Sequence, residues 1–325
     1  MARMAIQEVA EHIFRLPVFN PFGAVPTNTY VLVGARLGLV DPGPMHRRTR
    51  EDLVAGLADI GRRHEDVEEV VLTHGHADHY GMAHEFTWAR VLVGRRDLPK
   101  TVDLPAHMHS YEVAVRRLMP LWGVPPEVAR NIPDFFARLV AAGGSAAWAE
   151  PMDEGFLLEG FGPPIEVIET PGHTEGLVCL FRRADDVLLS SDQLLETIIP
   201  NPGLYAQDDP PGNGLADYIA SVRKLAPLPV RLVLPGHGRP FDGFAERIQA
   251  ILREHEERLL AVYRALDRDA GVYDCAVRLF PDRDWNNSYF AFIVLLEAQG
   301  YLALLRERGL AGSRREGERE VFWAI

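Results

Sequence analysis

Cysteine is scarce in this sequence, which excludes a fold that depends on disulfide bonds. Only Cys179 and Cys275 occur among the 325 residues, whereas small secreted domains rely on several closely spaced cysteines. Cys179 lies within an apolar, strand-like run, residues 177–181, where a cysteine usually packs as a small apolar side chain. We expect both cysteines to be reduced thiols in a cytoplasmic protein.

Long apolar runs are also missing. No run approaches the roughly 20 apolar residues that a membrane-spanning helix needs. Residues 1–8 contain an early glutamate and no apolar core, so they do not resemble a secretion signal. These absences predict a cytoplasmic location and no membrane partner.

The chain has no excess of positive charge. It carries 34 Lys and Arg against 46 Asp and Glu, a formal net charge of −12, and residues 241–325 alone hold 12 basic against 15 acidic residues. Proteins that follow a nucleic-acid backbone usually present a basic face. The charge therefore disfavours nucleic acid as a partner and favours a small-molecule substrate.

What the sequence does contain is a dense group of metal-ligand side chains directly after the strand-like segment 67–72. Residues 73–79 read Thr-His-Gly-His-Ala-Asp-His, with four potential ligands within six residues. In an extended segment residues two apart point the same way, so His74 and His76 can hold one ion together. Asp78 and His79 are adjacent in a turn and diverge toward a second position. Imidazole nitrogens and carboxylate oxygens at this density predict a transition-metal site.

Three further candidate ligands stand at the ends of predicted strands, where α/β folds gather their functional groups. Each occupies the turn after an apolar segment: His173 after residues 165–170, Asp192 after 187–191 and His237 after 230–234. With the first motif they make five histidines and two aspartates, enough ligands for two metal ions.

With these residues the chain resembles the metallo-β-lactamase fold superfamily of metallohydrolases. The resemblance rests on the order and separation of the seven candidate ligands and on Asp41, which ends an early strand-like segment. It implies that Asp192 bridges two ions and that Asp41 orients the ligand loop through hydrogen bonds without binding metal. The first ion would be held by His74, His76 and His173, and the second by Asp78, His79 and His237.

The resemblance also implies the fold class and the domains. We expect an α/β protein whose residues 1–240 form a four-layer αβ/βα sandwich, the metallo-β-lactamase fold, as the catalytic domain. Residues 96–150 lack strand patterning and are broken by prolines, which predicts a helical insertion. Residues 241–325 are expected to form a small, helical, winged-helix-like C-terminal domain.

The pattern of the last residues supports that C-terminal domain. Residues 244–266 and 286–300 are predicted helices, and residues 318–325 look like the last strand of a small hairpin. Asp242 is the expected N-cap of the first helix, and Gly300 is the expected stop of the second.

Departures from family patterns narrow the choice of branch. Flavodiiron reductases have glutamate in place of His76 and carry a flavodoxin domain, and true zinc β-lactamases lack an equivalent of His79 or of Asp192. β-CASP nucleases need a large inserted domain for which the chain has no room. The remaining set is similar to glyoxalase II, the acyl-homoserine lactonases and a mammalian β-lactamase relative with a winged-helix-like domain.

The resemblance implies a dinuclear hydrolase in which a hydroxide that bridges two divalent ions attacks a small acyl substrate: a thioester, an ester or a lactone. This activity is like that of hydroxyacylglutathione hydrolases, and Asp78 and Asp192 would be its catalytic carboxylates. Zinc is the first choice of metal, with iron or manganese as alternatives.

Three other functions stay open from the sequence. Carbonyl and phosphate chemistry both pass through oxyanions, so a metal-dependent phosphodiesterase or ribonuclease is the main alternative. An iron-dependent oxidation site such as persulfide dioxygenases use would need only the ligands of the first ion. The third open function is that of a non-catalytic binding protein, which would keep its metal ions for folding.

Two segments are candidates for substrate selection. The insertion carries apolar residues such as Met108, Tyr111 and Phe136, which predict a lid or wall over the metal ions. A helical subdomain with its own core, or a contact in a homodimer, explains them equally well. The resemblance implies that the loop 197–214 approaches the substrate, which makes Tyr205 a candidate hydrogen-bond donor to a developing oxyanion. A plain Pro/Gly-rich surface loop is the alternative.

Two other histidines imitate the metal motif. His107 and His109 are two residues apart but have no acidic neighbours, and the segment leads into a predicted helix. We expect them to be structural or surface residues.

Overall fold

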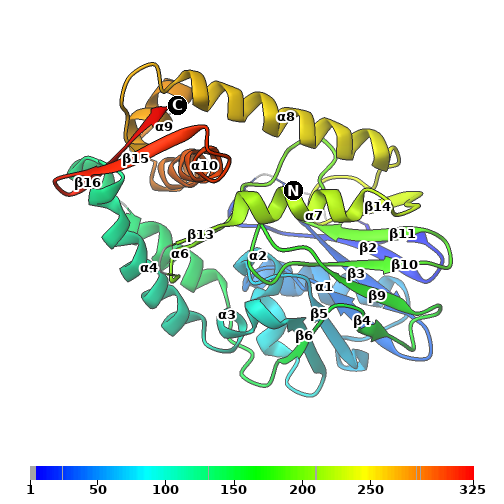
Figure 1. The fold of residues 1–325 in the computed structure, drawn as a ribbon. Helices are drawn as coiled ribbons and strands as arrows, with labels where there is room; N and C mark the ends of the chain where they lie inside the picture. The colour runs from blue at the N-terminus through cyan, green and yellow to red at the C-terminus, as the bar shows by residue number, and fades with distance from the viewer. Residues whose placement is uncertain (1–4, 24, 131, 209–210, 283, 286) are drawn as a thin grey trace.

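Two stacked β-sheets form the centre of the molecule (Figure 1). The computed structural model describes residues 5–23, 25–130, 132–208, 211–282, 284–285 and 287–325. Within these residues the first sheet has seven strands in sequential order. They are β1 (Gln7–Ala10), β2 (Ile13–Val18), β3 (Thr27–Val33), β4 (Leu37–Val40), β5 (Glu69–Leu72), β6 (Arg90–Gly94) and β7 (Glu150–Met152).

The second sheet has the order β14-β11-β10-β9-β8 within the described residues. Its central strands β9, β10 and β11 alternate in direction, and β14 runs parallel to β11. The carboxyl ends of β9, β11 and β14 therefore lie at one edge. The strands are β8 (Leu157–Leu158), β9 (Ile165–Glu169), β10 (Val178–Arg182), β11 (Val187–Ser191) and β14 (Leu232–Pro235).

Both faces of the second sheet are buried at its central strands β10 and β11, which explains why these two strands lack an alternating polar pattern. Val178 and Leu180 of β10 pack in a cluster with residues of the first sheet. Cys179 and Phe181 point the other way, into a cluster with residues of α7 (Gly214–Leu225) and α8 (Phe244–Arg264). Cys179 is thus a core residue, as its sequence context predicts.

The outer face of the first sheet is covered by helices as well. Leu53 and Leu57 of α1 (Arg47–Asp59) belong to the same apolar cluster as Val70 and Leu72 of β5. Helix, sheet, sheet and helix then follow one another, which confirms the predicted four-layer α/β fold.

The segment between β6 and β7 is helical, as predicted. Pro105 stands in the first turn of its longest helix, where a missing N–H breaks no hydrogen bond, and the Asp103 carboxylate accepts a hydrogen bond from the Ala106 N–H. The helices are α3 (Leu98–Val102), α4 (Leu104–Leu121), α5 (Pro126–Ala129) and α6 (Ile132–Ala142).

Short elements connect these layers. They are η1 (His64–Asp66), α2 (Ala77–Tyr80), η2 (Gly81–Glu85), η3 (Arg95–Asp97), β12 (Leu204–Tyr205) and β13 (Gly212–Asn213). None of the helices in the described part of the chain combines the length and the apolar character that crossing a membrane requires.

The C-terminal residues fold back onto the insertion. α9 (Val272–Leu279) and α10 (Ser288–Glu307) are followed by an antiparallel hairpin of β15 (Ala311–Glu316) and β16 (Arg319–Ala324), which confirms the predicted terminal strand. In Figure 1, α10 lies between α8 and the insertion helices α4 and α6. A winged-helix-like domain with a boundary at residue 240 stays a prediction.

Two predicted helix ends are wrong. Gly243, with a φ of 74° and no side-chain bond, is the N-cap residue of α8, in place of Asp242. α10 continues through Gly300, where a Cβ would lie 3.2 Å from the Leu215 Cβ, so the glycine lets α10 approach α7 closely. The stop is Gly309, which has a left-handed φ of 70°, as is common at the end of a helix. Asn286, the first residue of that predicted helix, lies outside the described residues.

Candidate metal centre

All seven predicted ligands lie at the carboxyl ends of strands from the two sheets. The motif at 74–79 follows β5, and the others follow strands of the second sheet: His173 after β9, Asp192 after β11 and His237 after β14. Because buried strands fix the start of each loop, the side chains meet in a small volume. This confirms the positions expected from the sequence, where candidate ligands were sought in the turns that follow apolar strands (the strand-end rule).

The side chains form two groups. The ligand atoms of His74, His76 and His173 lie within 4.8 Å of one another, and those of Asp78, His79 and His237 do the same. In the second group Nε2 of His79 lies 3.1 Å from Nε2 of His237. These are the two sets that the family resemblance implies.

Asp192 stands between the two groups. Its Oδ2 lies 3.6 Å from Nε2 of His173 in the first group. The same oxygen lies 3.6 Å from Nε2 of His79 and 3.6 Å from Nε2 of His237 in the second. One carboxylate is therefore within reach of both groups.

Hydrogen bonds on the outer side of the rings set their orientation. Nδ1 of His173 donates to the Asn201 carbonyl at 2.7 Å, and Nδ1 of His237 donates to the Pro26 carbonyl at 3.0 Å. A carbonyl can only accept, so Nδ1 of each ring carries the hydrogen, and Nε2 faces the interior of the cluster, where its lone pair is available when the ring is neutral.

The first group suits a metal ion because its rings are held neutral. Burial lowers the pKa of His76 to about 3 and lowers the pKa values of His74 and His173. Neutral imidazole is the form that binds a metal. Nε2 of His173 is buried without a hydrogen-bond partner among the described residues, and so is Oδ1 of Asp192, as expected for atoms whose lone pairs can coordinate a cation.

The second group also suits a metal ion, because its carboxylates are ionised. Burial acts to lower the pKa of His79, but the carboxylates of Asp192 and Asp78 outweigh it and raise that pKa well above its ordinary value. The pKa of Asp192 is held well below its usual range by the surrounding histidines, against the effect of burial. Ionised carboxylates packed among histidines favour a divalent metal ion at this place.

Asp41 supports the second group from behind. It is buried and adopts a left-handed backbone with a φ of 52°. Its carboxylate accepts hydrogen bonds from the Thr73 N–H at 2.8 Å, from the Thr73 hydroxyl at 2.6 Å and from Nδ1 of His79 at 2.9 Å. The contacts agree with the orienting role that the resemblance implies.

Sequence reasoning missed Asp97, which joins the two ligand loops. It is fully buried, and its carboxylate accepts hydrogen bonds from the Gly75 N–H at 2.7 Å and from the Thr174 hydroxyl at 2.5 Å. Gly75 lies between two ligands of the first motif, and Thr174 follows His173. Asp97 comes shortly after β6, so the strand-end rule, applied to that strand too, would have found it.

His107 and His109, whose spacing is like that of His74 and His76, do not belong to the candidate metal centre. His107 and His109 are on α4, and no candidate metal group within the described residues includes them. The His107 ring stacks on Tyr111, with centroids 6.4 Å apart.

Comparison with known proteins agrees with this geometry. Residues 22–237, which include all seven candidate ligands, match the family model described as the metallo-beta-lactamase superfamily. The chain belongs to this superfamily.

Relatives within the superfamily match nearly the whole chain. A protein of Bacillus subtilis described as "Probable metallo-hydrolase YqjP" is 28% identical over 316 residues, 96% of this chain and 98% of the relative. The crystal structure of a metallo-beta-lactamase family protein, TTHA1429 from Thermus thermophilus, is 27% identical with a TM-score of 0.84, covering 98% of this chain and 100% of the other.

A fungal relative carries a more specific name. A protein of Aspergillus fumigatus described as "Atrochrysone carboxyl ACP thioesterase" is 24% identical over 242 residues, 74% of this chain and 59% of the relative.

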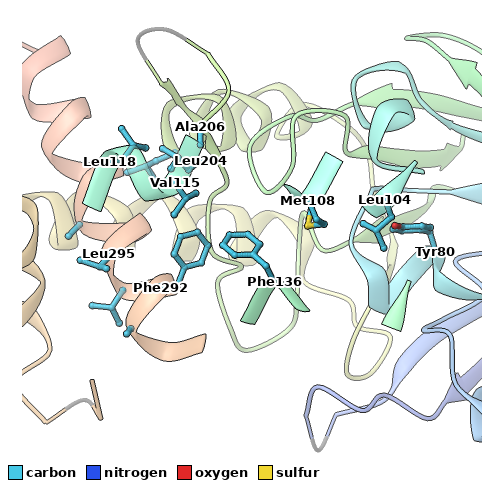
Figure 2. Packing of buried hydrophobic residues seen from close by; sticks show 14 of the residues in the cluster. Tyr80, Leu104, Met108, Val115, Leu118, Phe136, Leu204, Ala206, Phe292 and Leu295 are labelled. Atoms are coloured by element: carbon cyan, nitrogen blue, oxygen red, sulfur yellow. The ribbon is translucent and has the colours of Figure 1, made fainter. Parts of the chain in front are cut away.

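A cavity of about 350 Å³ adjoins the metal-ligand candidates of this superfamily member, a size typical of small-molecule sites. His76, Asp78, His173, Asp192 and His237 line one part of it. Most of the remaining wall is apolar and comes from the insertion, from α10 and from residues 195–205. The insertion therefore forms a wall of the site, as the first of its interpretations predicts, and also packs into a core with α10 (Figure 2).

Proposed function

We propose that the chain is a metal-dependent hydrolase of a small acyl compound, with a thioester as the first choice and an ester or lactone as related substrates. The observation that carries the proposal is that the donor cluster opens into a cavity whose other walls are mainly apolar. Such a cavity suits a substrate with one polar, reacting end and one apolar end.

The proposed centre holds two divalent ions, with zinc as the first choice. His74, His76 and His173 would bind one ion, and Asp78, His79 and His237 the other. A pair of such ions lowers the pKa of bound water and polarises the carbonyl oxygen of a substrate.

The residues of the chain supply position and charge for this chemistry. Asp192, whose Oδ2 is 3.6 Å from histidine nitrogens of both groups, would link the two ions and fix their separation. Asp78 and Asp192 together would offset part of the positive charge. Tyr205 lines the same cavity as the candidate ligands, and its role as a hydrogen-bond donor to the oxyanion is part of the proposal.

Two further observations support an acyl substrate over a phosphodiester. The first is the fungal relative, whose name describes that protein as a thioesterase. The net charge of −12 opposes binding of a polyanionic nucleic acid.

A comparison of initial rates tests the proposal. The protein, reconstituted with Zn²⁺, is assayed with an acetyl or octanoyl thioester and, separately, with bis(p-nitrophenyl) phosphate. We expect thioester hydrolysis that a chelator abolishes, that added Zn²⁺ restores and that Asp192→Asn lacks. Preference for the phosphodiester would replace the proposal with the phosphodiesterase alternative.

A further inference from the structure

We propose that the apolar part of the cavity binds the acyl chain of the substrate and that α4 and α10 together set the chain length that fits. The inference rests on the proposed function, because it assigns the apolar end of the substrate that this function requires. It commits to one occupant: an unbranched acyl group of medium length, attached to a thioester.

The wall on α4 is a single stripe. Leu104, Met108 and Tyr111 all line the cavity, and residues spaced by four and then three lie on one face of a helix. The stripe covers about 10 Å along the helix axis. That distance matches an extended chain of roughly eight carbon atoms in staggered conformation.

The opposite wall comes from α10. Ile293 and Leu296 line the cavity and are only partly buried, and their spacing of three residues places them on one face of this helix. Neighbouring Phe292 is buried, and its ring centroid lies 5.7 Å from that of Phe136 on α6. Figure 2 shows these two rings side by side between α10 and α6. This contact holds α10 against the insertion.

The hydroxyl of Tyr111, the polar group of the α4 stripe, is already bonded, so this wall suits an alkyl chain. The Tyr111 hydroxyl donates to the Leu204 carbonyl at 3.0 Å, which leaves its ring as the contact surface. Lys100 also lines the cavity, but its ammonium lies 3.3 Å from the Asp97 carboxylate. That lysine is next to the ligand loops rather than among the apolar stripes. The cavity is therefore polar at the metal-ligand end and apolar at the helix end.

The apolar end of the cavity is built by two segments that are distant in sequence, the insertion and α10. Neither the insertion nor the C-terminal helices would form a closed wall alone, and α10 reaches the cavity because it packs on α6 and α7. A residue on α10 can therefore select substrate although it lies far in sequence from every candidate metal ligand.

Variants that fill the cavity test the inference. Ile293→Trp adds bulk to the α10 wall, and Met108→Trp adds it to the α4 wall should the first variant fail to fold. Val113→Trp is the matched control, because Val113 is on α4 but is 37% exposed. Each variant is assayed with thioesters of N-acetylcysteamine that carry acyl chains of increasing length.

For the wild type, kcat/KM is expected to rise with chain length up to medium chains. Ile293→Trp should lower kcat/KM for the octanoyl thioester by at least about tenfold while changing the acetyl thioester by less than about twofold. Val113→Trp should keep the wild-type profile. If thioesters are hydrolysed and both cavity variants keep the wild-type dependence on chain length, the inference is wrong.

A binding measurement separates this inference from the proposed function. S-octyl and S-ethyl thioethers of N-acetylcysteamine, which cannot be hydrolysed, are titrated into the full-length protein by calorimetry. We expect the octyl compound to bind more tightly, and Ile293→Trp to remove that preference. If no acyl compound is hydrolysed but this preference holds, the proposed function fails and the apolar site stands. Equal affinities for both compounds would overturn the apolar site.

Discussion

The Thr174 hydroxyl donates a 2.5 Å hydrogen bond to the buried carboxylate of Asp97. Through the same carboxylate, which also accepts from the Gly75 N–H at 2.7 Å, the loop that carries His76 is tied to the loop that carries His173. The two loops start from different sheets, so this carboxylate fixes the separation of ligands that no single strand controls.

Replacing Asp97 should therefore weaken metal binding without removing a ligand. Asp97→Ala leaves buried donors unpaired, and we expect a fall of about 10- to 100-fold in Zn²⁺ affinity. Competition with a chromophoric chelator measures this affinity. Asp153→Asn, at an exposed ion pair with Arg95, is the control and should bind Zn²⁺ like the wild type. Unchanged affinity in Asp97→Ala would show that the loops hold their positions without it.

Gly236 leaves no room for a side chain beside the candidate ligands. A Cβ at this position would lie 2.5 Å from Oδ1 of Asp192 and 2.8 Å from Cε1 of His79, and both of these side chains are buried. Gly236→Ala should displace Asp192 and lower kcat/KM for a thioester by at least about tenfold. Gly23→Ala, where the added Cβ meets nothing within 4 Å, should keep wild-type activity. Full activity in Gly236→Ala would contradict the geometry of the centre.

Both cysteines should be inert in the folded protein. Burial raises the pKa of Cys179 to about 12 and that of Cys275 to about 11, so almost no thiolate forms near neutral pH. We expect no reaction with a disulfide reagent in the native state and two reactive thiols after unfolding. Rapid labelling of the native protein would show that one of these side chains is accessible.

His255 should make the metal-free protein less stable in mild acid. Burial on α8 lowers its pKa to about 4, while an unfolded histidine has a pKa of about 6.5. Between these values the unfolded chain binds more protons than the folded one, so stability falls as the pH drops below about 6.5.

A neutral replacement isolates this effect. His255→Gln can keep a partner for the Tyr301 hydroxyl, which lies 2.7 Å from Nδ1 of the histidine. Urea unfolding gives the free energy of unfolding of both proteins at about pH 7.5 and at about pH 5.5. The fall in this free energy between the two pH values should be smaller in His255→Gln than in the wild type, by about 1 kcal/mol. Equal losses in the two proteins would mean that His255 does not titrate in this range.

The positions of the candidate ligands could be predicted because their signals are local. His74 and His76 are two residues apart in one loop, and Asp192 directly follows a strand whose apolar run is plain in the sequence. The periodicity of buried strands and the ends of those strands are properties of short segments.

Features that depend on packing between distant segments could not be predicted. Gly300 looks like a helix stop, but its role is set by Leu215 on another helix, 3.2 Å from where its Cβ would lie. The α10 wall of the cavity likewise depends on the contact of Phe292 with Phe136, which no local pattern indicates. Whether the insertion is a wall or an independent core was open for the same reason.

A titration of the metal-free protein with Zn²⁺, followed by the rate of thioester hydrolysis, tests the central claim most directly. If the two groups on either side of Asp192 each hold an ion, the rate should reach its plateau at two equivalents of Zn²⁺ per chain. A plateau at one equivalent, or no hydrolysis at any ratio, would contradict a two-ion acyl hydrolase.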